Sequence, residues 1–196
     1  MAIRVQGEEK DQIVVQESER QLIEGIQSGD REALRRLYER FSRFAMGVAL
    51  RYVPEREDAL DVVHDSFVII LTSINSFEYR GEGSLRNWVS KIVSHHAIDW
   101  IKKHEQLSFS DQMPDEIEED EEAVIEDIPK NLLNEMIGRL PLRYRIVINL
   151  RAFEELSHKE IALRLGISEN VSVTLFSRAK RKLAKMMKEY LNSQRI

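Results

Sequence analysis

Residues 157–188 read SHKEIALRLGISENVSVTLFSRAKRKLAKMMK, and this stretch decides how the C-terminal part of the chain folds. Ser157 and Glu160 have the S-x-x-E spacing of a capping box, in which two side chains satisfy free backbone donors at a helix start. Gly166 suits the left-handed position that ends a helix, and Ser168 can cap the next one. The stretch predicts two helices joined by a short turn, a geometry shared by ordinary helical hairpins and DNA-binding helix-turn-helix motifs.

The composition favours a helical protein without thiol chemistry. Hydrophobic residues make up 42% of the 196 positions, with only 8 Gly and 4 Pro, which favours helices. The absence of cysteine excludes disulfides, Cys-ligated zinc and a thiol nucleophile. The chain start lacks the apolar run of a signal peptide, and the longest strongly apolar run, Phe67–Leu71, is too short to cross a bilayer. We expect a cytoplasmic protein with no membrane insertion.

Charge is distributed unevenly along the chain. The net charge of −5 is unusual for a protein that binds nucleic acid. Residues 131–196, however, hold 13 basic and 6 acidic side chains, whereas residues 106–130 hold 1 basic and 10 acidic ones. The C-terminal part is thus basic, as attraction to phosphates requires.

The acidic segment marks the main boundary in the chain. Residues 106–130 repel one another and offer few large apolar side chains, which predicts a flexible linker. A solvated spacer is the simpler interpretation, and an internal DNA mimic that covers a basic face of the same chain is the alternative. Residues 1–20 are polar and are expected to fray. We therefore predict an all-α fold with two small helical domains, at residues 21–105 and 131–196.

Helical periodicity also runs through the N-terminal block. Apolar residues recur at steps of three and four up to Pro54, which ends one helix. In the next helix, Asp58, Asp61 and Asp65 form an acidic stripe opposite the apolar positions. Such stripes are usually only solvated, but one beside apolar residues can also dock a basic partner.

A glycine-containing loop, Tyr79–Ser84, precedes a helix predicted over residues 85–103. Cations and aromatics are interleaved here, a combination that suits a single nucleic-acid strand with stacked bases and neutralised phosphates. Packing in the core is the more usual role of an aromatic such as Trp88. The interleaved residues are Tyr79, Arg80, Arg86, Trp88, Lys91, Trp100, Lys102 and Lys103.

Two blocks together resemble the extracytoplasmic-function sigma factors, the two-domain members of the sigma-70 family. DALDVVHDSF at residues 58–67 is similar to the D-A-x-D-x-V-Q-[DE]-x-F pattern of the sigma-2 domain. Residues 77–99 resemble the F-R-G-x-x-S-F-x-x-W-L block that ends in A-I-D, and residues 140–183 follow the sigma-4 pattern. The resemblance covers roughly residues 22–104 and 131–190.

The resemblance implies a promoter-specificity factor with no cofactor and no catalysis of its own. Its partners would be promoter DNA and core RNA polymerase, through the β′ clamp helices and the β flap. The residues implied in polymerase docking are Asp58, Asp61, His64 and Asp65. Those implied in −10 DNA binding are Tyr79, Arg80, Ser84, Asn87, Trp88, Lys91, Ser94, His95, Lys102 and Lys103. Those implied in −35 DNA binding are Ser168, Asn170, Ser172, Val173, Thr174, Ser177, Arg178, Lys180 and Arg181.

The chain departs from the family pattern at several of these positions. His64 replaces the usual Gln, and Ser94 and His95 replace a common Arg and Asn. Val173 and Leu175 stand at usually basic positions, and apolar groups contact thymine methyls but cannot make the guanine contacts of Arg. We therefore expect a weak or thymine-directed −35 readout. The apolar face of Val173 and Leu175 also predicts a protein partner, either an anti-sigma factor or a coactivator.

Two other functional classes remain open from the sequence. A stand-alone helix-turn-helix regulator with an N-terminal effector or dimerisation domain would need neither the acidic stripe nor the loop. A metal-dependent enzyme would have to use His95 with Asp99, or His64 with Asp61 and Asp65. No full set of ligands has suitable spacing for such a metal site.

Overall fold

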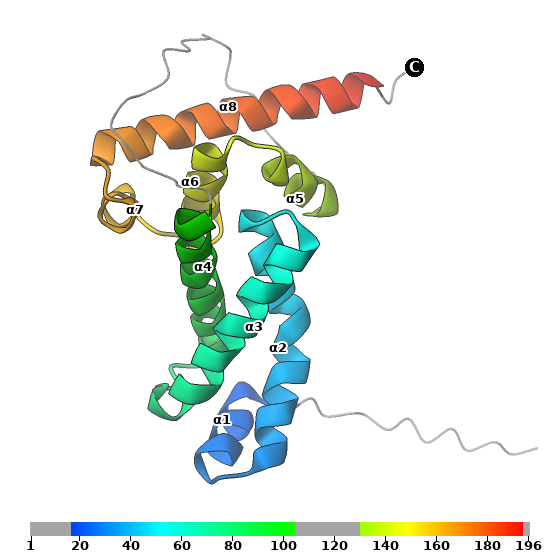
Figure 1. Cartoon of the computed structure of the whole chain (residues 1–196), viewed down its shortest axis with the longest axis vertical. Helices are drawn as coiled ribbons and strands as arrows, with labels where there is room; N and C mark the ends of the chain where they lie inside the picture. Colours follow the sequence, from blue (N-terminus) through cyan, green and yellow to red (C-terminus); the bar gives the residue numbers. More distant parts are fainter. Residues whose placement is uncertain (1–16, 105–129, 194–196) are drawn as a thin grey trace, which may run out of the picture.

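The computed structural model describes residues 17–104 and 130–193, and every regular element within these ranges is a helix. The all-α prediction is therefore confirmed for the described part of the chain (Figure 1). The elements are α1 (Glu19–Gln27), α2 (Arg31–Tyr52), α3 (Arg56–Ser73), the 3₁₀ turn η1 (Ile74–Ser76), α4 (Ser84–His104), α5 (Lys130–Gly138), α6 (Leu142–Ala152), α7 (His158–Leu165) and α8 (Glu169–Ser193).

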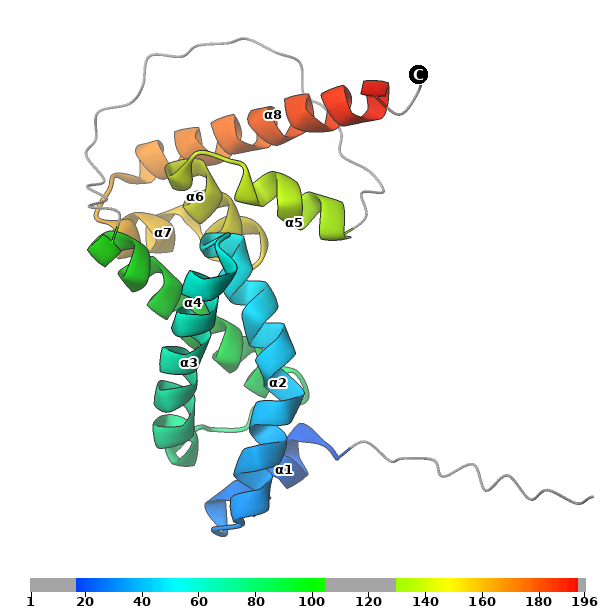
Figure 2. The same cartoon turned by 45° about the vertical axis from the view of Figure 1, so that its right-hand side comes forward.

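The N-terminal unit, α1 to α4, is a bundle around one interior (Figures 1 and 2). The helices α2, α3 and α4 all pack against one another, and α1 packs against α2. Each helix buries one apolar stripe; in α2 the stripe includes Leu37, Phe41, Ala45 and Val48. Full burial of one such large side chain stabilises by about 1.5–3 kcal/mol, so packing contributes more to these helices than propensity does.

The C-terminal unit, α5 to α8, is arranged under its longest helix. Figure 1 shows α8 running across α6 and α5, and α8 also packs against α7. The buried cluster on this side comprises Met136, Ile137, Leu140, Ile148, Ala179, Leu183 and Met187.

The turn between α7 and α8 has the predicted geometry. Ser157 Oγ accepts from the Glu160 N–H at 3.3 Å, and the Glu160 carboxylate accepts from the Ser157 N–H at 2.8 Å. Gly166 ends α7 with φ at 70°, in the left-handed region that favours glycine. Ser168 Oγ accepts from the Val171 N–H at 3.3 Å, as an N-cap does. Helices α7 and α8 thus form a helix-turn-helix.

The two units share part of their interior. Ile146, Val147 and Leu150 of α6 belong to the same buried cluster as the α1–α4 core. Asn149 Nδ2 donates to the backbone oxygen of Arg51 at 2.7 Å, which docks α6 on the end of α2. The proposed domain boundaries remain a prediction, because packing here is continuous across the two units.

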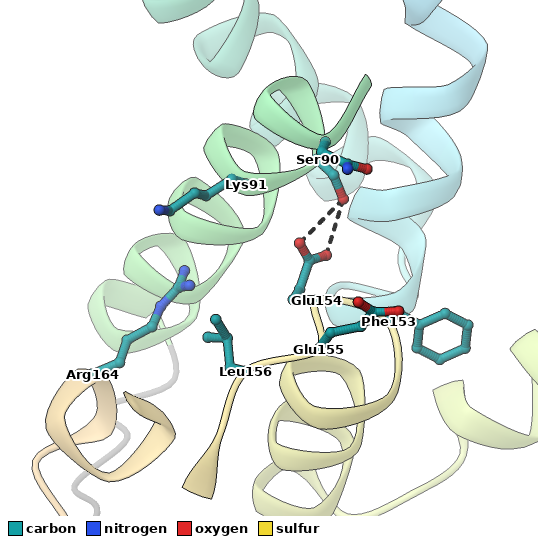
Figure 3. Close-up of a pocket in the computed structure, with 8 residues that line it drawn as sticks. Ser90, Lys91, Phe153, Glu154, Glu155, Leu156 and Arg164 are labelled. Carbon is teal, nitrogen blue, oxygen red and sulfur yellow. Dashed lines mark hydrogen bonds between the residues drawn. The ribbon is translucent and has the colours of Figure 1, made fainter. Parts of the chain in front are cut away.

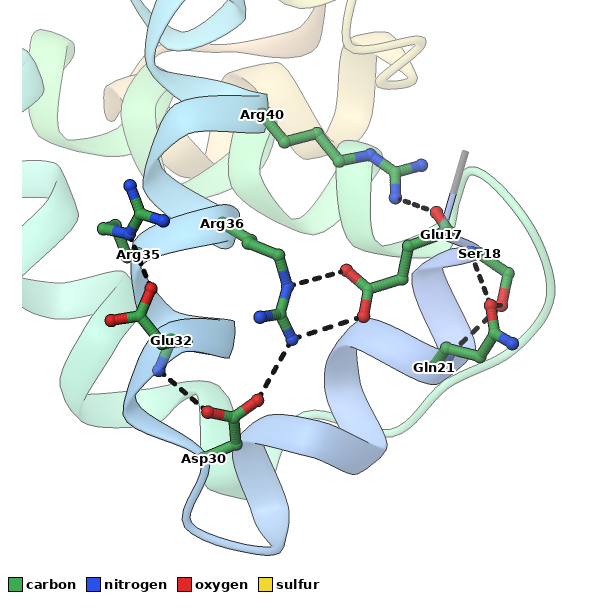
Figure 4. Close-up of polar contacts among 8 residues, drawn as sticks. All are labelled: Glu17, Ser18, Gln21, Asp30, Glu32, Arg35, Arg36 and Arg40. Atoms are coloured by element: carbon green, nitrogen blue, oxygen red, sulfur yellow. Dashed lines mark hydrogen bonds and ion pairs between the residues drawn. The ribbon is translucent and has the colours of Figure 1, made fainter. Parts of the chain in front are cut away.

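Residues 17–20, which the sequence assigned to a frayed tail, take part in the fold. Glu17 pairs with Arg36 at 3.1 Å, and its backbone oxygen accepts from Arg40 Nη1 at 2.6 Å (Figure 4). Ser18 and Gln21 form a capping box that starts α1 at Glu19. The predicted acidic linker lies outside the described residues, except for Lys130 at the start of α5.

Candidate nucleic-acid interface

A carboxylate from α1 holds the start of α4. Glu19 Oε2 accepts from the backbone N–H groups of Gly83 and Leu85, both at 3.0 Å, and Oε1 accepts from that of Arg86 at 3.3 Å. The carboxylate also faces the positive end of the helix dipole. Sequence reasoning missed Glu19, because no local pattern connects it with a loop 64 residues away.

The loop before α4 turns on two glycines. Gly81 and Gly83 have φ of 114° and 88°, values that glycine adopts readily and other residues rarely. Ser84 Oγ accepts from the Arg80 N–H at 3.3 Å, which closes the loop onto the first residue of α4. The Tyr79 hydroxyl donates to Glu82 at 3.3 Å. The Arg80 side chain is exposed at the loop tip.

Trp88 is half-buried, and its indole packs on the Phe77 ring with centroids 5.1 Å apart. The indole therefore packs against the segment that precedes the loop, as expected for a core aromatic. The sequence-based role of Trp88 in DNA binding stays a prediction.

The outward side of α4 carries most of its predicted nucleic-acid contacts. Ser94 is the exception: it has no exposed surface, and its hydroxyl donates to the Lys91 backbone oxygen at 3.1 Å. The prediction that Ser94 contacts the −10 strand is wrong for this conformation, because a buried hydroxyl cannot reach a base. The exposed residues are Asn87, Lys91, His95, Lys102 and Lys103.

His95 differs electrostatically from the lysines around it. Although part of His95 is exposed, the side chains packed around the rest of its ring, followed by the positive charges of Arg164 and Lys91, lower the pKa of His95 to about 4. The imidazole is therefore neutral near pH 7. A neutral imidazole offers one hydrogen-bond donor and one acceptor to a base edge, but it has no positive charge to attract a phosphate.

The outer face of α3 is both acidic and apolar. Asp61, His64 and Asp65 are exposed, and Asp58 is half-buried. Beside them lie Leu60, Val68 and Ile69, whose exposed fractions are 41%, 62% and 42%. Sequence reasoning missed these apolar neighbours. Their signal is the run Phe67–Leu71, which holds more apolar residues than one helix face can bury.

The metal-site alternative finds no geometric support in the described residues. His96 Nε2 of α4, and not His64, lies 3.3 Å from Asp65 Oδ2. No group of three or more His, Asp or Glu side chains within residues 17–104 and 130–193 is placed to hold a metal ion.

The outward side of α8 has a different composition from the one predicted. Ser172 is fully buried, and its Oγ lies 3.0 Å from His158 Nδ1, so this side chain secures α8 to α7. Leu175 is only 1% exposed, whereas Val173 is 46% exposed. The predictions that Ser172 contacts DNA and that Leu175 shares an apolar surface with Val173 are wrong, because both side chains face the interior.

The other predicted residues of this helix-turn-helix remain accessible. Thr174 Oγ1 donates to the Asn170 backbone oxygen at 2.8 Å, and Lys180 Nζ lies 5.3 Å from the Phe176 ring centroid. Exposed residues are Ser168, Asn170, Val173 and Lys180; half-buried ones are Thr174, Ser177, Arg178 and Arg181.

An exposed helix-turn-helix in one unit, and a cation-bearing loop and helix in the other, define a two-part helical protein that binds nucleic acid. The sigma-70 region 2 family model matches residues 37–106, and the sigma-70 region 4 model matches residues 130–183. The chain belongs to the sigma-70 family, in its extracytoplasmic-function group. It is a promoter-specificity factor for transcription initiation, with core RNA polymerase and promoter DNA as partners.

The chain is also similar to named sigma factors. The chain is 35% identical over 133 residues to RNA polymerase sigma factor SigV of Bacillus subtilis, covering 67% of this chain and 77% of the relative. It is 28% identical over 172 residues to RNA polymerase sigma factor YlaC of the same organism, covering 85% and 98%. The solved structure of CnrH in complex with the cytosolic domain of CnrY is 22% identical, covers 88% of this chain and 99% of that chain, and has a TM-score of 0.49.

None of the helices in the described ranges combines the length and the apolar character that a bilayer span requires.

Proposed function

We propose that three faces of the molecule divide the work of promoter recognition. The outer face of α3 docks on polymerase, the Tyr79–Ser84 loop with α4 holds the −10 strand, and α8 contacts −35 DNA. One observation carries this assignment: most of the matched residues on α3 and α4 are exposed, and those at the start of and along α8 are exposed or half-buried, with Ser172 as the exception. The stand-alone regulator is less favoured, because it would not need a region 2 match.

On α3, the mixed acidic and apolar composition supports docking. Asp61 and Asp65 suit a basic partner surface, and Val68 adds apolar area that becomes buried on binding. The partner element proposed here is the β′ clamp-helix pair, with the β flap contacting the C-terminal unit.

On α4, the neutral imidazole of His95 and the amide of Asn87 are suited to base edges, whereas Lys91, Lys102 and Lys103 are suited to phosphates. On the loop, Arg80 and the half-buried Tyr79 ring offer a cation and a stacking surface.

On α8, Val173 is an exposed apolar residue of the proposed reading surface. A valine contacts a thymine methyl but offers no donor to guanine. Lys180, Arg178 and Arg181 then bind phosphates. Direct recognition of bases in the −35 element is expected to favour thymine.

A regulatory protein partner is a further part of the proposal. Leu163 of α7 is 87% exposed, and with Val68 on α3 it offers separate apolar contact points. An anti-sigma factor or a coactivator is the expected kind of partner. The factor is proposed to act in the cytoplasm and to catalyse no reaction itself.

Run-off transcription with core RNA polymerase on a library of upstream sequences tests the proposal. The wild-type protein should initiate from a defined subset of promoters. The Asp61→Lys/Asp65→Lys double variant should lose polymerase binding, because it reverses the charge of the α3 face. Glu189→Lys/Glu169→Lys changes the net charge equally at exposed positions of α8 and should retain polymerase binding. Unchanged binding by the Asp61/Asp65 variant would contradict the proposed docking face.

A further inference from the structure

The carboxylate of Glu19 bridges the Tyr79–Ser84 loop and α4, and only 3% of this residue is exposed. Its Oε2 accepts from the N–H of Gly83 in the loop and from that of Leu85 in α4, both at 3.0 Å. A single oxygen that holds one donor from each segment fixes the angle at which the loop enters the helix. Glu19 therefore constrains the shape of the loop as well as the start of α4.

The loop needs a constraint of this kind, because its own backbone is permissive. Gly81 and Gly83 have positive φ, and glycine loses more conformational freedom on ordering than any other residue. The bonds within the loop are local: the Ser84 N–H donates to the Gly81 backbone oxygen at 3.1 Å, and the Arg80 N–H donates to Ser84 Oγ at 3.3 Å. These bonds close the turn but do not attach it to the rest of the protein. The Glu19 carboxylate supplies such an attachment.

Helix α1, which carries this carboxylate, is held against α2 by ion pairs. Glu17 pairs with Arg36 at 3.1 Å, and Arg36 also pairs with Asp30 at 3.1 Å (Figure 4). Ser18 caps α1 and so places Glu19 in its first turn. Helix α1 also packs on η1, the 3₁₀ turn shortly before the loop. The carboxylate is therefore fixed in place before any strand binds.

The groups proposed to meet the −10 strand lie on both sides of the junction between the loop and α4. Tyr79 and Arg80 precede this junction on the loop. Asn87 follows it in the first turn of α4, and its N–H donates to the Gly83 backbone oxygen at 2.9 Å. Glu19 is too buried to contact DNA itself, so its effect on the strand must pass through these residues. A loosened junction would let the loop groups and the helix groups move independently.

A second buried carboxylate contacts α4 away from the loop and allows a comparison. Ser90 Oγ lies 3.0 and 3.2 Å from the two carboxylate oxygens of Glu154, in the segment between α6 and α7 (Figure 3). The side chain of Glu154 is 9% exposed. Both carboxylates reach α4 from a distant part of the sequence, but the bond between Ser90 and Glu154 involves no residue of the loop. It therefore bears on the helix without acting on the loop.

We propose that Glu19 is a positioning residue for −10 recognition: by joining the loop to α4, it holds the strand-contacting groups in the arrangement that receives the single strand. This inference rests on the function proposed for the loop and α4. A loop that is already ordered loses less entropy when the strand binds, so the affinity for the strand depends on Glu19 although Glu19 does not touch it. The −35 contacts of α8 lie in the other unit and do not depend on this carboxylate.

Binding of two DNA probes to the holoenzyme tests the inference. Both probes carry the same −35 duplex from a promoter selected by run-off transcription, and only the first continues into the single-stranded −10 element. Glu19→Ala should weaken binding of the first probe about tenfold, which corresponds to the cost of ordering about one loop residue. It should change binding of the second probe by less than about twofold. A general loss of folded protein would instead weaken both probes equally.

Ser90→Ala is the matched control, because it removes the other buried carboxylate contact of α4. It should change the affinity for either probe by less than about twofold, since Ser90 shares no partner with the loop. Hydrogen exchange of the backbone amides of Gly83, Leu85 and Arg86 in the free proteins reports on the junction itself. Exchange of these amides should be faster in Glu19→Ala and unchanged in Ser90→Ala.

Wild-type affinity for the −10 probe in a folded Glu19→Ala protein would overturn the inference, and so would equal weakening of both probes. If that variant fails to fold, as judged by circular dichroism, the same comparison on Glu19→Gln decides the question, since an amide of the same size has one acceptor oxygen for three donors. Absent transcription by the wild-type protein would reject the proposed function and this role together. Promoter-dependent transcription with unchanged strand binding by the variant would reject only the positioning role.

Discussion

The carboxylate of Glu19 lies 3.0 Å from the backbone nitrogen of Leu85, although 66 residues separate the two along the chain. Three backbone donors at the start of α4 depend on this one side chain, which is 3% exposed. Helix α1 thereby fixes where α4, the helix proposed to hold the −10 strand, begins.

Replacing Glu19 with alanine should lower the free energy of unfolding. A hydrogen bond to a charged group contributes about 1.5–3 kcal/mol. In the variant, water can reach some of the three backbone N–H groups that Glu19 no longer accepts from, so the total loss should be about 2–3 kcal/mol. Urea unfolding measures the loss. Glu24→Ala is the control on the same helix, because its ion pair with Arg20 is exposed to solvent and contributes little to stability. Equal effects of both substitutions would contradict the capping role.

Two residues of the C-terminal unit, Gly166 and Glu155, have left-handed backbone conformations. Substitutions at these two positions should change stability in opposite directions. Gly166→Ala should destabilise by about 1 kcal/mol, because a φ of 70° strains an alanine backbone. No atom lies within 4 Å of the added Cβ, so a steric clash adds nothing to this cost. Glu155, with φ at 56°, already carries that strain. Glu155→Gly should therefore be neutral or stabilising by up to about 1 kcal/mol, because relief of strain competes with greater unfolded-chain entropy. Thermal unfolding of both variants gives the signs, and destabilisation by Glu155→Gly would argue against the strain.

Val173 and Leu175 should respond very differently to truncation. Leu175→Ala should cost about 2–5 kcal/mol, because it leaves a cavity in the interior of the helix-turn-helix. Val173→Ala should change stability by less than about 0.5 kcal/mol. It should nevertheless weaken the preference for thymine in −35 DNA, as measured by transcription from substituted promoters. An equal loss of stability in the two variants would contradict the observed orientation of α8.

His95 should titrate far below an ordinary imidazole. Its pKa of about 4 in the folded protein lies below the ordinary imidazole pKa of 6.5, so the folded state binds a proton less readily than the unfolded state. The stability that neutral His95 contributes is complete above pH 6.5 and is lost as the pH falls through the window from 6.5 to about 4. Proton NMR of the ring should give a midpoint near 4. A midpoint above 6 would show that neither the packing around the ring nor the charges of Arg164 and Lys91 lower its pKa in solution.

Sequence reasoning performed best where the determining interactions are local. The capping box of Ser157 and Glu160 and the terminating Gly166 each involve residues within one helical turn, so their spacing alone predicts the helix-turn-helix. Ser172 and Leu175 were misplaced because a family pattern assigns an average role to a position. The inward direction of these two side chains depends on how α8 sits over α6 and α7.

The contacts that sequence reasoning missed are those made between distant segments. Glu19 meets the start of α4, and Glu154 meets Ser90, in both cases across more than sixty residues. A single glutamate in a polar stretch gives no periodic signal of its own. Such side chains are found only when the packing of the helices brings a backbone donor or a hydroxyl to the carboxylate.

The position of Glu19 has a practical consequence for dissecting and recombining sigma factors. The segment that matches sigma-70 region 2 starts at residue 37, downstream of α1. A fragment cut at that boundary would keep every residue of α4 and still leave its first backbone amides without their acceptor. Promoter specificity should therefore transfer between related factors only when the exchanged module carries α1 along with the region that touches DNA.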